Sequence, residues 1–129
     1  MWLSRAGDFF GLTLGAGLRR LSEAISGAKY RTDSGRLHGM KVRELLSDES
    51  KWTQGTFAAT KGGHPCQPLS PRAAKWCLVG AIERCYEIEV QARIRIVVIE
   101  HIRDSIGDWN DAPTRSFGAV KRLVDELDI

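Results

Sequence analysis

The spacing of apolar residues predicts amphipathic helices near residue 40 and at the C-terminal end. After Ser116, a residue type favoured at helix N-caps, the apolar positions follow one helical face. They are Phe117, Val120, Leu123, Val124 and Leu127. The stretch "VRELLS" has the same kind of spacing and predicts a short helix from Val42 to about Ser47.

The stretch "SPRAAKWCLVGAIERCYE" (70–87) carries its own helix start signal. Ser70 suits the N-cap and Pro71 the first helical position, so we expect a helix from Pro71 to about Glu87. On that helix Trp76 and Gly80 lie together, apart from the main apolar arc. A mid-helix glycine costs about 1 kcal/mol relative to alanine, so we expect another segment to cross there. The turns "WTQG" (52–55) and "WNDAP" (109–113) are the candidates.

Residues 88–107 fit two patterns. Apolar residues occupy every even position from Ile88 to Val98, which is typical of a strand. The stripe Ile94, Val98, Ile102 and Ile106 fits a helix instead, with Gly107 as its C-cap. We favour the helix, because a strand of this length is unusual. The chain from 40 to 129 is therefore expected to be one all-α or nearly all-α domain of about four helices, with at most one short strand near 52–58.

Residues 1–39 differ from this domain and are interpreted as an N-terminal arm or linker. Leu18, Leu21 and Ile25 recur at helical spacing, so a helix over 18–30 is an option, and "RTDSGRLHG" (31–39) is a polar linker by composition. Six basic and three acidic residues give the arm the whole net charge of +3. This mildly basic arm is a weak basis for binding nucleic acid, which usually needs a dense basic stripe.

Composition supports a single globular domain. The chain has 129 residues, 43% hydrophobic and 27% charged. No apolar run approaches the ~18 residues of a membrane span. The three cysteines are odd in number, and Cys77 and Cys85 lie too far apart on one predicted helix for a disulfide or a shared tetrahedral zinc site. We therefore expect a reducing, cytoplasmic location and no metal or cofactor.

Cys77 has two interpretations. As the nucleophile of a cysteine hydrolase it would need a base such as His101 and an orienting residue such as Asn110. The predicted helix start places it beyond the first turn, where the helix dipole no longer favours a thiolate, and no glycine-rich oxyanion turn precedes it. We interpret Cys77 as a core residue and keep the hydrolase as the alternative.

The "WNDAP" turn also has two interpretations. Asn110 and Asp111 suit a turn that Pro113 ends, and Trp109 suits an anchor in the core. The same side chains would alternatively form a polar pocket beside the other tryptophan turns. The candidate binding surface consists of Trp52, Gln54, Trp76, Gly80, Trp109, Asn110 and Asp111.

Three motifs in order, W-T-Q-G, W-C-x-x-G-A and W-N-D-x-P, lie between residues 40 and 129. In these the chain resembles a family of small bacterial and phage proteins classed as a domain of unknown function. The resemblance implies a compact, mainly helical domain without an assigned activity. We therefore predict a small non-enzymatic accessory protein that binds another protein or itself, through the arm or the candidate surface. A hydrolase using Cys77 and nucleic-acid binding through the arm are the alternatives.

Overall fold

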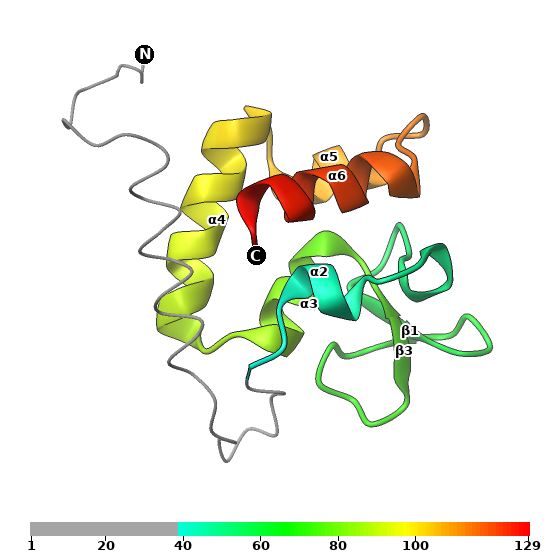
Figure 1. The fold of residues 1–129 in the computed structure, drawn as a ribbon. Coiled ribbons are helices and arrows are strands. Elements are labelled where there is room, and N and C mark those ends of the chain that lie inside the picture. The colour runs from blue at the N-terminus through cyan, green and yellow to red at the C-terminus, as the bar shows by residue number, and fades with distance from the viewer. Residues whose placement is uncertain (1–38) are drawn as a thin grey trace, which may run out of the picture.

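The computed structural model describes residues 39–129, which form a mixed α/β domain (Figure 1). In chain order the elements are α2 (Val42–Leu45), the 3-10 helix η1 (Glu49–Lys51), β1 (Ala58–Thr60), β2 (Pro65–Cys66), β3 (Ala73–Trp76), α3 (Leu78–Cys85), α4 (Ile88–Ile102), α5 (Ile106–Asp111) and α6 (Phe117–Leu127). The expectation of an all-α fold with about four helices is wrong: this part of the chain has five α-helices and a three-stranded antiparallel sheet. The predicted arm, with its optional helix over 18–30, lies outside the described residues except for Gly39.

The predicted helix over 71–87 accounts for most of this error. Its first half is strand β3, which pairs with β1 so that Ala58 faces Trp76 and Ala59 faces Lys75. The hydroxyl of Ser70 accepts from the Arg72 amide and caps a turn rather than a helix. Helix α3 begins only at Leu78. A partner strand fifteen residues earlier thus overrides the local start signal, because tertiary pairing outweighs weak propensity.

The sheet has the order β2-β1-β3, with β1 and β2 joined as a hairpin. The amide of Thr60 donates to the carbonyl of His64, and Gly63 adopts a positive φ of 91° in the turn between them. Trp52 adds an isolated parallel bridge to Trp76. The short strand expected near 52–58 overlaps β1 (Ala58–Thr60) only at Ala58.

The helical interpretation of residues 88–98 is confirmed by α4. The predicted end at Gly107 is wrong, because the helix ends at Ile102 and Arg103 takes the left-handed cap conformation with φ of 59°. Ser105 then caps a new helix, α5, by accepting from the amide of Asp108. Gly107 lies inside α5.

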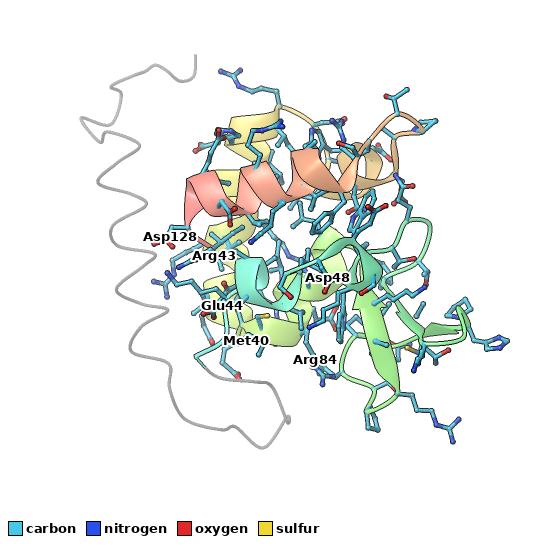
Figure 2. All side chains as sticks on the ribbon, turned by 45° about the vertical axis from the view of Figure 1, so that its right-hand side comes forward. Met40, Arg43, Glu44, Asp48, Arg84 and Asp128 are labelled. Atoms are coloured by element: carbon cyan, nitrogen blue, oxygen red, sulfur yellow. The ribbon has the colours of Figure 1, made fainter. Side chains whose placement is uncertain are left out.

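Helices α2 and α6 are confirmed, and Ser116 caps α6 by accepting from the amide of Ala119. Their apolar faces pack with α3 and α4 in one core. The largest fully buried apolar members are Val42, Leu46, Leu78, Ile82, Ile94, Val98, Val120, Val124, Leu127 and Ile129. Where α2 meets the end of α6, Asp128 pairs with Lys41 at 2.9 Å and with Arg43 at 3.1 Å; Arg43 and Asp128 are labelled in Figure 2.

Helix α4 lies at one edge of the molecule and the sheet at the opposite end (Figure 1). Among residues 39–129, no helix combines the length and the apolar character needed to cross a membrane.

Candidate functional site

Asn110, at the end of α5, is fully buried and joins three segments of the chain. Its Oδ1 accepts from the indole N–H of Trp52 at 2.8 Å and from the backbone N–H of Leu78 at 3.0 Å. Its Nδ2 donates to the carbonyl of Thr53 at 3.2 Å and to Oδ1 of Asp111 at 2.8 Å. Two acceptor positions and two donors are the whole capacity of the amide. All hydrogen-bonding groups of this side chain are therefore used within the domain, and we call Asn110 with these four bonds the asparagine joint.

Gln54 and Gly55 reinforce this joint from the loop after Trp52. The Gln54 side-chain amide donates to the carbonyls of Asn110 at 2.9 Å and Ala112 at 3.1 Å. The amide of Gly55 donates to Oδ1 of Asp111 at 3.0 Å. The "WTQG" and "WNDAP" turns thus meet in one hydrogen-bonded network, in which Gln54 and Asp111 are exposed.

The tryptophans of the candidate surface have separate surroundings. Trp76, on β3, is buried and donates to the carbonyl of Pro68 at 3.0 Å, with the Arg84 guanidinium 5.6 Å from its ring. Half-buried Trp109 stacks under the Arg115 guanidinium at 3.9 Å. Half-buried Trp52 packs against the ring of Phe117, with centroids 6.3 Å apart.

Gly80 lies in the first turn of α3 and faces the backbone of Phe57. A Cβ at position 80 would lie 1.9 Å from the Phe57 carbonyl oxygen, well inside contact distance. The same carbonyl accepts from the amide of Cys77 at 3.1 Å. The loop that follows "WTQG" therefore crosses the start of α3, and only glycine permits this approach.

Cys77 is the N-cap of α3, so its predicted position beyond the first turn is wrong. Its Sγ accepts from the amide of Gly80 at 3.3 Å, and the residue is 5% exposed. A helix N-terminus favours a thiolate. Burial nevertheless raises the pKa of the Cys77 thiol, and the hydrogen bond from Gly80 offsets this rise only in part. At neutral pH the sulfur is a protonated helix cap.

A small cavity of about 320 Å³ lies beside Cys77. Its lining residues are Gly55, Thr56, Phe57, Cys77, Val79, Gly107 and Asp111. None of the described histidines lines it. His101 is 3.5 Å from a carboxylate oxygen of Glu126 on α6, and His64 is exposed in the hairpin turn. The structure thus places Cys77 beside the carboxylate of Asp111 and gives His101 and Asn110 other partners.

Residues 39–129 contain no group of three or more His, Cys, Asp or Glu side chains that is arranged to hold a metal ion. The three cysteines in this range are free thiols.

Helix α4 carries a row of exposed apolar residues that the sequence analysis missed. Three of the four large hydrophobic residues that are exposed in residues 39–129 are on this helix: Ile88 (69%), Ile96 (57%) and Ile99 (44%). Together with exposed Ala92 they form a row at helical spacing, which we call the outer stripe. Ile94 and Val98 point the other way and are fully buried. The strand-like alternation of 88–98 is the signal of this helix, since it places apolar residues on both sides.

The fold and this site define a small α/β domain with a buried asparagine joint and an apolar outer helix. The model of the family of unknown function DUF6197 matches residues 38–127, and the chain belongs to this family. The expected membership of an uncharacterised domain family is thereby confirmed. No curated protein and no solved structure matches the chain.

Proposed function

We propose that this protein is a small, non-enzymatic accessory protein of bacterial or phage origin that binds another polypeptide through the outer stripe of α4. The observation that carries the proposal is the exposure of Ile88, Ile96 and Ile99 on a helix whose opposite side is already packed. Isolated exposed apolar residues are ordinary, whereas a continuous apolar row marks an interaction surface. The bacterial or phage origin rests on the resemblance of the motifs alone.

The geometry of the stripe favours a helical partner. Apolar residues spaced three and four apart form a ridge that fits the groove of an amphipathic helix. Glu89 and Arg93 are exposed beside the ridge, and Glu100 is half-buried there, so both signs of charge are available as a polar rim. The partner we infer is therefore an amphipathic helix with an apolar stripe of its own.

The candidate surface around the tryptophan turns supports binding less well. Trp76, Gly80 and Asn110 are buried, and the hydrogen-bonding groups of Asn110 are all used within the domain. Only Gln54 and Asp111 of that set are exposed. This network holds the domain together rather than offering free groups to a partner.

Binding also has more support than hydrolysis. A nucleophilic cysteine needs a lowered pKa or a neighbouring base. Burial instead raises the pKa of Cys77, and His101 is placed beside Glu126. We place the protein in the cytoplasm in this proposal, because the three cysteines are free thiols.

A site-specific photo-crosslinker tests the proposal in the cells to which the chain is native. We place benzoylphenylalanine at position 96 of the full chain and, as the matched control, at the exposed Lys61 of the β1–β2 turn. We expect position 96 to yield a discrete adduct with one other polypeptide, and position 61 to yield none. The adduct should disappear when Ile88→Asp is added, because a charge on the stripe opposes apolar docking.

Equal adducts at both positions, or only products within the chain at position 96, would contradict the proposal.

A further inference from the structure

We propose that residues 18–25 of this same chain cover the outer stripe when no partner is bound. This segment lies outside the described residues, and its sequence places Leu18, Leu21 and Ile25 at helical spacing. The consequence that a partner must displace this segment before it binds rests on the proposed function. The contact itself does not depend on any partner.

Helix α4 has apolar residues on two sides. Ile94 and Val98 fill the core on the inner side, and Ile88, Ile96 and Ile99 form the outer side. A helix that covers a domain surface normally has one apolar face and one polar face, whereas a helix that is apolar on both sides is buried on both. The outer stripe is therefore an apolar row, bordered by exposed Glu89 and Arg93, that a second segment can cover.

The described chain begins close to the end of the stripe. The backbone amide of Val42 donates to the hydroxyl of Tyr86 at 3.1 Å, and Tyr86 lies two residues before Ile88. Figure 1 likewise shows the described chain starting beside the end of α4 that leads out of α3. The described chain thus begins on the side of the domain where α3 leads into α4.

The residues that connect Ile25 to Gly39 can span a distance longer than the outer stripe. Residues 26–38 separate Ile25 from Gly39 and span up to about 43 Å when extended, at ~3.3 Å per residue. From Ile88 to Ile99 the helix rises only about 16 Å, at ~1.5 Å per residue. The extended connection is therefore more than twice as long as the stripe.

The width of the stripe favours a tethered occupant over a second copy of the chain. A stable dimer buries about 800 Å² on each partner, so a second copy would need a contact surface that extends beyond this row of four side chains. A tethered segment has an effective concentration of the order of millimolar, so a small contact is enough to hold it. A partner helix must then displace residues 18–25. Its apparent affinity for the protein falls in proportion to the fraction of molecules in which the stripe is uncovered.

Hydrogen exchange of the purified full chain, read by mass spectrometry, tests the contact. We expect the amides of residues 18–25 to exchange at least about tenfold more slowly than in an unstructured peptide, because docking holds them closed. The variants Ile96→Asp and Leu21→Asp should both return them to the unstructured rate. Lys61→Asp and Ser22→Asp are the matched controls and should leave the protection unchanged.

The thermal midpoint of Ile96→Asp should stay close to that of the wild type, since this side chain is largely exposed and the domain core is unchanged. Unprotected amides in the wild type, or protection that survives Ile96→Asp, overturn the proposal. Protection that grows with protein concentration, with a dimer seen in sedimentation, assigns the stripe to a second copy and overturns it as well. These outcomes are independent of the crosslink to a foreign polypeptide, so each proposal can fail alone.

Discussion

The indole nitrogen of Trp52 donates a hydrogen bond of 2.8 Å to Oδ1 of Asn110, a residue 58 positions further along the chain. Leu78, at the start of α3, donates to the same oxygen. Three sequence motifs, each containing a tryptophan, therefore meet at one buried amide. Because a buried polar group is costly when it loses its partners, this amide fixes how the three segments are arranged.

Replacing Asn110 by alanine should lower the free energy of unfolding by about 2–4 kcal/mol, because the N–H groups of Trp52 and Leu78 lose their acceptor. Urea unfolding followed by tryptophan fluorescence measures the change. Thr114→Ala, at an exposed position three residues past α5, is the control and should change stability by less than about 0.5 kcal/mol. A loss below 1 kcal/mol for Asn110→Ala would show that the joint is dispensable.

Two glycine-to-alanine substitutions should have opposite effects. Gly80→Ala places a methyl group against the Phe57 carbonyl, so we expect a loss of about 1–3 kcal/mol from overpacking. Gly107→Ala meets no atom within 4 Å inside α5, so we expect no loss and a gain of up to about 1 kcal/mol. Thermal melts of the two variants beside the wild type check both signs. The contact of α3 with the Phe57 loop would be in doubt if both variants melted like the wild type.

Neighbouring isoleucines of α4 should differ sharply in their effect on stability. Ile94 is fully buried, and Ile94→Ala should cost about 2–5 kcal/mol through lost burial and a cavity. Ile96 is 57% exposed, and Ile96→Ala should cost less than about 1 kcal/mol. Chemical denaturation of both variants measures the difference, and similar losses for the two would contradict the assignment of inner and outer faces.

Alkaline pH should destabilise the domain. Burial raises the pKa of Cys85 from its ordinary 9.0 to about 12, and it also raises the pKa of Tyr86 above its ordinary value. Above pH 9 the unfolded chain therefore binds fewer protons than the folded one, and the free energy of unfolding falls by up to about 1.4 kcal/mol per pH unit for each group. Below pH 8 both groups are protonated in either state and contribute no slope.

Urea midpoints between pH 7 and 11 follow this loss. The fall between pH 9 and 11 should be smaller in Cys85→Ala, which lacks one of the groups whose pKa is raised by burial, while Tyr86 and Cys77 remain. An identical fall in that variant would assign the effect to other groups.

The three thiols should react in a fixed order. Cys66 is half-buried on the sheet edge, whereas Cys77 and Cys85 are buried with raised pKa values. Since the thiolate is the reactive form, we expect iodoacetamide at pH 7.5 to modify Cys66 first and the other two only after unfolding. Peptide mapping identifies the modified residues, and Cys66→Ser should remove the early reaction. Rapid modification of Cys77 in the folded protein would instead favour the hydrolase.

Local patterns in the sequence were sufficient for the helices whose partner is the core alone. The N-cap Ser116, the apolar face of α6, the short helix α2 and the helical state of residues 88–102 all follow from spacing and capping chemistry. The need for a packing reason at Gly80 was also visible, since a glycine there has a cost that some contact must offset. The Phe57 carbonyl against it comes from the tertiary structure.

The strands, the start of α3 and the saturation of Asn110 were decided only by tertiary structure. Residues 73–76 have no strong preference of their own, and their pairing with β1 turns a plausible first helical turn into a strand. That pairing places Cys77 at the N-cap of α3. The backbone N–H of Leu78 then donates to the side chain of Asn110, which lies near the C-terminal end of α5. Sequence spacing describes what one element prefers by itself. It does not describe which distant backbone will satisfy its hydrogen bonds, and in this domain those distant partners define both the sheet and the joint.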